Sequence, residues 1–308
     1  MTDGPRRKPR TITPLAMPAI AEGGPLAFPL TREGVETVVR AALDEDRAFE
    51  DITTIATVLS DRRVRGSIMA RKDGVIAGIS LAVEAFRQLD PKIAVRVDVE
   101  DGGRVRAGSP VLWLSGHARG LLSAERVALN FLQRLSGIAT LTARYADAIR
   151  GTGAAILDTR KTTPGWRSLE KYAVRAGGGR NHRFSLADAV LIKDNHLQAV
   201  DGDIAFAIGR ARELSMPGTL VEVECDTLPQ VKRAAEAGAD IILLDNMPPE
   251  MLREAIALID GRARTEASGG VTLETVRAIA ETGVNWISVG ALTHSAPALD
   301  LGLDFETA

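Results

Sequence analysis

The sequence lacks the features that mark several large classes of protein. A single cysteine in 308 residues excludes an intramolecular disulfide framework and makes a reducing cytoplasm the expected compartment. No apolar run approaches the roughly 18 residues that a membrane-spanning helix needs. The formal net charge is −2 and the pI is near 6.2, so neither general nucleic-acid binding nor membrane-surface binding is expected. What remains is a globular composition, 45% hydrophobic and 25% charged, with enough apolar material for a sizeable core.

Against this neutral background, positive charge is concentrated in one segment. Between Asp158 and His196 there are eight Lys or Arg, two His and only four Asp or Glu. Apolar runs at 154–157 and 189–192 flank the segment and read as buried strands. Cations at the ends of buried strands predict a pocket for a small polyanion better than they predict a solvated surface.

Composition and the pattern of predicted helices and strands divide the chain into three parts. Residues 1–25 are rich in proline, glycine and small residues, and are expected to form a flexible tail. Residues 26–145 mix short strands and helices, with helices expected at 31–44, 80–89 and 123–150 and strands at 64–71 and 93–99.

Later in the chain, strands and helices alternate. Strand-like runs lie at 154–157, 189–192, 220–223, 241–244, 264–267 and 286–289, and helical patterns lie at 201–214, 228–237, 249–259 and 272–281. This alternation predicts βα units on a parallel sheet. No Gly-x-Gly-x-x-Gly follows a first strand, so the dinucleotide fingerprint is missing and an α/β barrel is favoured over a doubly wound sheet.

Nearly every predicted strand delivers a polar group where its apolar run stops. In barrels these carboxyl ends build the active site, although any one of the residues could simply start a solvated loop. The cations Arg160, Lys161, Arg183 and Lys193 can form an anion clamp, or can be surface charges paired with nearby acids. The glycines at 177–179 favour the clamp, because they allow close backbone approach to a ligand.

Two further groups end later strands. Glu224 and Asp245 could hold sugar hydroxyls or Mg²⁺, and an ion-pair role with the neighbouring lysines is equally compatible with their spacing. Ser268, Gly269 and Gly270, and then Val289, Gly290 and Ala291, follow the last two strands, where barrels often bind phosphate. Tight turns without a ligand are the alternative.

The ordered set of these motifs resembles the quinolinate phosphoribosyltransferase family from about residue 30 to the C-terminus. The segments that carry the resemblance are 129–139, 158–165, 171–174, 177–183, 191–196, 221–224, 243–246 and 287–292. Departures from the family pattern are small and touch no charged position: Trp166 stands where an aliphatic residue is common, and Gly270 where some members have Asn.

The resemblance implies a subunit of two domains. An N-terminal α/β sandwich over 26–145 would precede an incomplete, seven-stranded α/β barrel over 146–292, and residues 293–308 would pack back on the first domain. It also implies a homodimer with shared active sites, with larger assemblies left open, in which Arg126 reaches the neighbouring site.

The resemblance also implies a reaction: phosphoribosyl transfer from phosphoribosyl pyrophosphate to quinolinate with Mg²⁺, giving nicotinate mononucleotide, pyrophosphate and CO₂. By family match the dicarboxylate would meet Arg126, Arg160, His182, Arg183 and Lys193, and Thr159 would also bind substrate. Lys161 would face the pyrophosphate, Glu224 and Asp245 would hold ribose hydroxyls and the metal indirectly, and the two glycine turns would cradle the 5′-phosphate.

Three other functions are compatible with parts of the pattern. A paralogous phosphoribosyltransferase-like protein found with molybdate transport genes would share the barrel, but the intact set of basic residues argues against it. A Schiff-base aldolase would use Lys193 or Lys161 as its nucleophile and would need an apolar site around that lysine. A metabolite-binding protein would bind quinolinate without turnover.

Overall fold

The computed structural model describes residues 26–306, so the predicted tail at 1–25 lies outside the described residues. These residues form two compact units. The barrel unit comprises Ala148–Arg160 and His182–Val289, and the antiparallel unit comprises residues 26–147, Lys161–Asn181 and residues 290–306. The segment Lys161–Asn181 therefore groups with the antiparallel unit, although its position in the sequence lies between two barrel strands.

The antiparallel unit contains a four-stranded sheet in the order β12-β1-β5-β3. Its strands are β1 (Arg63–Ala70), β3 (Ala94–Val97), β5 (Pro110–His117) and β12 (Leu301–Phe305), all paired antiparallel. Strand β12 pairs with β1 from Gly66 opposite Phe305 to Ala70 opposite Leu301. The last described residues thus complete a sheet begun more than 200 positions earlier in the chain. A second, two-stranded sheet joins β2 (Gly74–Val75) and β4 (Arg104–Val105).

This unit also contains helices, and side chains cap the N-termini of α1 and α2. They are α1 (Arg32–Glu45), the 3₁₀ helix η1 (Ala48–Glu50), α2 (Ile52–Thr57), α3 (Ile79–Leu89), α4 (Ala118–Ala148), α5 (Arg167–Ala176) and α11 (Ala291–His294). Thr31 accepts a hydrogen bond from the Gly34 amide and Asp51 from the Thr54 amide, which satisfies N–H groups that the first helical turn leaves open. Helix α4 begins five residues before the predicted start, and α5 was not predicted.

The barrel unit contains six parallel strands in the order β6-β11-β10-β9-β8-β7. They are β6 (Ala155–Leu157), β7 (Val190–Ile192), β8 (Val221–Cys225), β9 (Ile241–Asp245), β10 (Arg264–Ser268) and β11 (Trp286–Ser288). These are the six runs that the sequence pattern predicted. The α/β class with an open barrel is confirmed, but the sheet has six strands among residues 26–306, one fewer than the resemblance implied.

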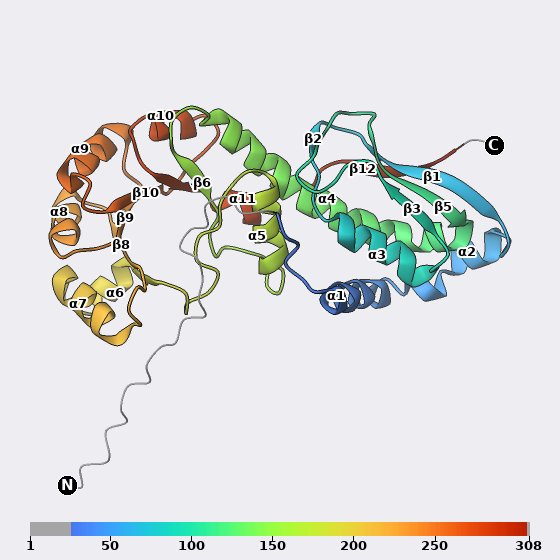
Figure 1. Cartoon of the computed structure of the whole chain (residues 1–308), viewed down its shortest axis with the longest axis horizontal. Coiled ribbons are helices and arrows are strands. Elements are labelled where there is room, and N and C mark those ends of the chain that lie inside the picture. The colour runs from blue at the N-terminus through green and yellow to red at the C-terminus, as the bar shows by residue number, and fades with distance from the viewer. Residues whose placement is uncertain (1–25, 307–308) are drawn as a thin grey trace, which may run out of the picture. The chain divides into compact units, whose positions relative to one another are not determined.

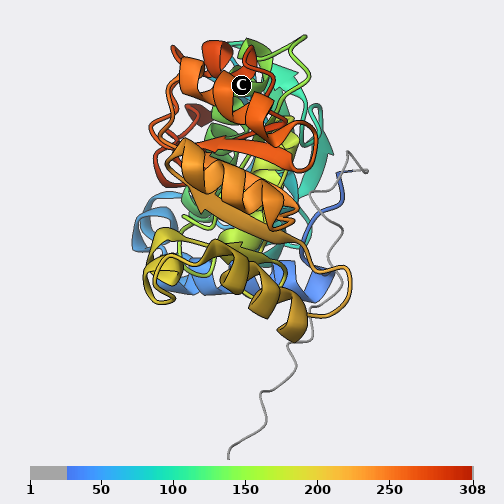
Figure 2. The same ribbon diagram turned by 90° about the vertical axis from the view of Figure 1, so that its left-hand side faces the viewer.

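Helices lie between and outside these strands. They are α6 (Asp194–Gln198), α7 (Ile204–Leu214), α8 (Leu228–Glu236), α9 (Pro249–Ile259) and α10 (Val276–Ala280). Figures 1 and 2 show α7, α8 and α9 covering one face of the sheet formed by β7 to β10, and α8 contacts both β8 and β9. No helix among residues 26–306 has the length and apolar character needed to cross a membrane.

The two faces of the barrel strands differ in chemistry, because successive side chains of a strand point to opposite sides. In β8, Val221, Val223 and Cys225 are fully buried on one side, and Glu222 and Glu224 lie on the other. Burial raises the pKa of the Cys225 thiol to about 12, so this cysteine is an inert part of the apolar face. The carboxylates of Glu222 and Glu224 lie on the opposite, inner face of the barrel.

Candidate active site

The carboxyl ends of the barrel strands carry most of the residues that the sequence singled out. In strand order from β7 to β11 these are Lys193, Glu224, Asp245, Ser268 and Val289, with Arg160 following β6. The strands are parallel and in register, with Ser268 opposite Asp245, so their ends meet at one edge of the sheet. This edge is where enzymes built on barrels hold their catalytic groups.

One cation and one carboxylate of the prediction are directly paired. The Lys193 ammonium forms an ion pair with Glu224 across the neighbouring ends of β7 and β8. The Glu224 side chain is largely buried, while that of Lys193 is about half exposed. A Schiff-base nucleophile requires an apolar environment that lowers the pKa of its amine, so this charged pairing argues against the aldolase alternative at Lys193.

Two guanidinium groups form the core of the predicted anion clamp. Arg183 donates from Nη1 to the carbonyl of Ala189 at 3.0 Å, which holds its side chain along the start of β7. Burial, and then repulsion from the guanidinium of Arg160, lowers the pKa of Arg183 below its ordinary value. Glu222 and Asp188 act on the pKa of Arg183 in the opposite direction. Guanidinium groups of this kind can bind the carboxylates of an anion in two-point contacts.

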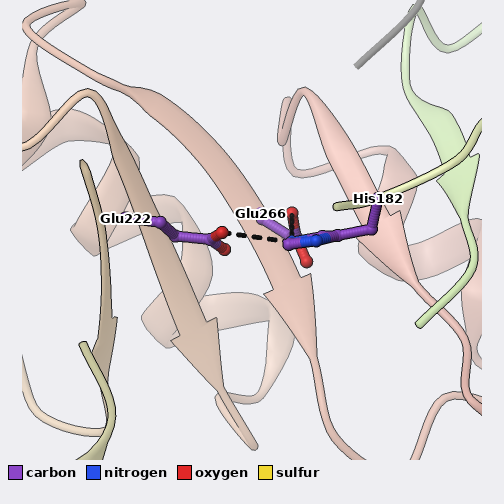
Figure 3. Close-up of side chains that lie close together, drawn as sticks. All are labelled: His182, Glu222 and Glu266. Atoms are coloured by element: carbon purple, nitrogen blue, oxygen red, sulfur yellow. Dashed lines mark ion pairs between the residues drawn. The ribbon is translucent and has the colours of Figure 1, made fainter. Parts of the chain in front are cut away.

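Near these groups lies a buried cluster of His182, Glu222 and Glu266. The sequence places both glutamates among the polar residues at the strand ends, but it predicted no role for them. Nε2 of His182 lies 3.1 Å from Oε2 of Glu222 and 3.5 Å from Oε2 of Glu266, as Figure 3 shows. Both glutamates are almost completely buried on the inner faces of β8 and β10. Ser288 on β11 donates a hydrogen bond to Oε1 of Glu266.

The same cluster fixes the chain around His182. The His182 amide donates to Oδ1 of the buried Asp158 at 2.8 Å, and the Arg183 amide donates to Nδ1 of the His182 ring at 2.7 Å. The ring nitrogens of His182 are therefore engaged with protein groups, whereas the sequence prediction had His182 contact the substrate anion. The signal for Glu222 and Glu266 was present in the sequence, because each stands two residues before a predicted strand-end residue and shares its face.

The first glycine turn has a geometry that only glycine satisfies. Gly269 has φ +92°, and a Cβ atom there would meet Oδ1 of Asn246 at 2.2 Å. The Asn246 amide donates to the carbonyl of Ser268 at 2.9 Å, so the ends of β9 and β10 are tied together at the turn. Gly270 also has a positive φ, and its Cα faces open space. This turn presents backbone to the carboxyl edge of the sheet.

Asp245 lies beside the turn as a half-buried carboxylate. Nδ2 of Asn246 donates to its Oδ2 at 2.6 Å. Asp245 and Glu224 end neighbouring strands and offer the oxygen donors that Mg²⁺ prefers. Among residues 26–306, one group of three potential metal ligands has ligand atoms that all lie within 4.8 Å of one another: His182, Glu222 and Glu266.

Four predicted residues belong to the antiparallel unit. Arg126 is exposed on α4, and Lys161 is exposed directly after Arg160. The carbonyl of Lys161 accepts a hydrogen bond from Thr293 on α11 at 2.7 Å. Gly290 and Ala291 follow Val289 and start α11. Thr159, half-buried between Asp158 and Arg160, remains in the barrel unit.

An α/β barrel whose strand ends gather cations, carboxylates and a glycine turn is typical of enzymes that act on phosphorylated or carboxylated substrates. Residues 51–136 match the N-terminal domain of the quinolinate phosphoribosyl transferase family, and residues 138–304 match its C-terminal domain. The chain belongs to this family.

Individual relatives agree with the family match. The chain is 46% identical over 278 residues to the nicotinate-nucleotide pyrophosphorylase (carboxylating) of Mycobacterium leprae, covering 88% of this chain and 97% of the relative. It is 44% identical over 260 residues to the probable enzyme of the same name from Bacillus subtilis, covering 84% and 89%. The crystal structure of NadC from Streptococcus pyogenes superposes with a TM-score of 0.85 at 42% identity, covering 90% of this chain and 99% of that one.

Proposed function

We propose that the protein transfers phosphoribosyl from phosphoribosyl pyrophosphate to quinolinate and releases CO₂, giving nicotinate mononucleotide and pyrophosphate for NAD synthesis. Family membership supports this reaction. The observation that carries it at the level of the site is the neighbouring pair of Arg160 and Arg183, since burial and then the charge of Arg160 lower the pKa of Arg183. Quinolinate brings two adjacent carboxylates, which match two adjacent guanidinium groups.

We propose the following division of labour at the site. Arg160, Arg183 and Lys193, with Arg126 from a second subunit, would surround the dicarboxylate. Thr159 and His182 would lie beside them, with His182 supporting Arg183 because its ring nitrogens are engaged with protein groups. Glu224 and Asp245 would hold ribose hydroxyls. Lys161, which follows Arg160 directly in the chain, would face the pyrophosphate. Ser268, Gly269 and Gly270, with Val289, Gly290 and Ala291, would present backbone N–H groups to the 5′-phosphate.

Positioning and electrostatics would then carry the reaction. The pyridine nitrogen forms a bond to C1 of the ribose as the bond from C1 to the pyrophosphate oxygen breaks, through an oxocarbenium-like state that nearby carboxylates stabilise. The quaternised nitrogen next stabilises the electron pair left on the ring carbon when its carboxylate departs as CO₂, and that carbon takes up a proton. No covalent nucleophile is required, which agrees with Lys193 being ion-paired.

Mg²⁺ is the proposed metal. The carboxylates of Glu224 and Asp245, on neighbouring strand ends, have the donor chemistry for it, and each already has one protein partner in Lys193 or Asn246. These residues would therefore hold the ion in part through water or through the pyrophosphate. When bound, it would neutralise charge on the leaving pyrophosphate.

A homodimer with shared sites is also proposed. The large apolar side chains Ile52, Ile55 and Leu59 are strongly exposed on and just after α2, with Ile52 81% exposed. Arg119 on α4 ties this segment down by donating to the carbonyls of Val58 at 2.8 Å and Ile55 at 3.1 Å. Arg126 is exposed further along the same helix. An exposed apolar patch near an unburied arginine fits a surface that a second copy covers.

We propose the cytoplasm as the compartment, because a chain with a single cysteine has no intramolecular disulfide that would require an oxidising environment.

The decisive test of the activity mixes the protein with quinolinate, phosphoribosyl pyrophosphate and Mg²⁺. Release of CO₂ with formation of nicotinate mononucleotide is expected, and nicotinate, which lacks the second carboxylate, should be a poor substrate. No release, or equal rates with both acids, would contradict the proposal.

The shared site has its own test. Arg126→Ala and Arg183→Ala subunits are each expected to be nearly inactive alone. After mixing and random reassociation, about a quarter of the wild-type activity should return, because one site of each heterodimer is intact. Absence of recovery, with heterodimers verified by native mass spectrometry, would show that each subunit builds its site alone.

A further inference from the structure

We propose that Glu222 and Glu266 are positioning residues that act through His182: they hold one tautomer of its ring, and the ring in turn fixes the backbone of Arg183. This inference rests on the proposed function only where it concerns quinolinate binding. The arrangement of the ring itself can be tested without any substrate.

The first step is the tautomer of His182. Its Nδ1 accepts a hydrogen bond from the Arg183 amide at 2.7 Å, and an amide N–H can only donate. Nδ1 therefore carries a lone pair, and the ring proton lies on Nε2. Nε2 lies 3.1 Å from Oε2 of Glu222 and 3.5 Å from Oε2 of Glu266, so the nitrogen that carries the proton is the one beside the two carboxyl groups. The two glutamates thus select the Nε2–H form.

The second step links the ring to the clamp. Because the ring accepts from the Arg183 amide, a rotation of the imidazole would release the backbone at the residue whose guanidinium belongs to the clamp. The Asp158 carboxylate holds the other side of this short segment through the His182 amide at 2.8 Å. The imidazole of His182 therefore links the buried carboxyl groups of Glu222 and Glu266 to the backbone of Arg183.

The third step concerns charge inside the barrel. Two ionised carboxylates beside a neutral imidazole would bury a double negative charge, which is costly. Oε1 of Glu222 and Oε2 of Glu266 are buried and accept no hydrogen bond from the residues that the structure describes. Burial, and then repulsion from Glu222, raises the pKa of Glu266, with Asp158 adding to the rise and His182 and Ser288 opposing it. We therefore expect Glu266 to hold a proton near neutral pH.

A metal ion fits the cluster poorly, although the three ligand atoms are close enough to surround one. A metal-bound histidine offers one nitrogen lone pair to the ion and keeps a proton on the other nitrogen. Here Nδ1 already accepts from a backbone amide, so coordination through Nε2 would leave the ring without a proton. The geometry therefore favours a proton at Nε2 over an ion.

The substrate-free test is nuclear magnetic resonance of the full-length protein labelled with ¹⁵N at the histidine rings. The chain has four histidines, and a His182→Gln variant identifies the signals of His182 by their loss. Near pH 7 the pattern of a neutral Nε2–H ring is expected, unchanged on adding the diamagnetic ion Zn²⁺. A protonated ring, an Nδ1–H ring, or a metal-induced change at His182 would each overturn the proposal.

The substrate-dependent test compares Glu222→Met with Glu222→Gln. Methionine keeps the length but cannot accept from Nε2–H, so the KM for quinolinate should rise about tenfold or more while that for phosphoribosyl pyrophosphate changes little. Glutamine retains an acceptor and should restore most of the loss. Glu266→Gln mimics a protonated acid and should behave like the wild type near pH 7.

Asp240→Asn is the matched control, because it makes a carboxylate-to-amide change at the opposite end of the barrel, where Asp240 accepts from the Val221 amide. It should leave both KM values and the His182 signals unchanged. Equal KM effects on the two substrates in Glu222→Met, or no effect, would overturn the proposal. If that variant fails to fold, the wild-type spectrum and the glutamine variants still decide. An inactive wild type with the expected spectrum would contradict the proposed function and leave the ring arrangement standing.

Discussion

The two sheets of this protein use the same alternation of side chains for opposite purposes. In the antiparallel sheet, Ile68, Leu112 and Leu114 are buried, and the other face carries exposed polar groups such as Arg96 beside the ring of Trp113. In the parallel sheet, the outer face is apolar and the carboxylates point inward. The difference teaches that an inward-facing charge marks chemistry, whereas an outward-facing charge of the same type marks solvation.

Stability provides the largest contrast. Leu112→Ala removes a fully buried side chain from the antiparallel sheet and should lower the free energy of unfolding by about 2–5 kcal/mol. Ser115→Ala, on the more exposed face, should change it by no more than about 0.5 kcal/mol. Urea titration of both variants measures the difference. Similar losses in the two would show that the faces of this sheet are not distinct.

For activity, the larger loss is expected in the barrel and the smaller one in the antiparallel sheet. Arg183→Ala is expected to lower kcat/KM for quinolinate about 100-fold, because it removes one of the two guanidinium groups of the clamp. This corresponds to about 2.7 kcal/mol of lost transition-state stabilisation. Arg96→Ala, on the antiparallel sheet, should stay within about twofold of the wild type. Comparable activity losses would break the contrast.

The smallest expected effect is a pH dependence of stability that belongs to the barrel interior. Burial raises the pKa of Glu266 to about 8 in the folded protein, above the value of 4.5 for a free glutamate. Between these values the folded state binds the extra proton, so stability is highest at low pH and falls as pH rises through about 8.

Thermal unfolding from about pH 5 to 8.5 tests this sign. The Tm of the wild type minus that of Glu266→Gln should decrease by a few degrees as pH rises, because the amide cannot ionise. A difference that is flat, or that grows with pH, would show that Glu266 is ionised in the folded barrel.

Much of the barrel could be predicted because its signals are local. Each strand is a short apolar run, and each following helix has an apolar face at helical spacing, so the six barrel strands were found close to their true positions. The residues at the strand ends followed from the rule that parallel strands gather their carboxyl ends.

Other features depended on distant parts of the chain. Helix α5 lies in the basic segment, and its charged residues Glu170 and Lys171 are buried, against what their composition indicates. Glu170 is compensated by Arg134 on α4, 36 positions earlier. Half of the basic segment therefore serves the packing of the antiparallel unit, and only tertiary pairing could reveal that division.

By itself, the sequence determined the class of the fold, the strands, the glycine turns and the cations that a dicarboxylate needs, because periodicity and residue chemistry are properties of short segments. Only the tertiary structure decided that His182 turns toward Glu222 and Glu266, and which acid keeps a proton. Those outcomes depend on burial and on charges brought together from four separate stretches of chain, and no local pattern encodes the electrostatic field at their meeting point.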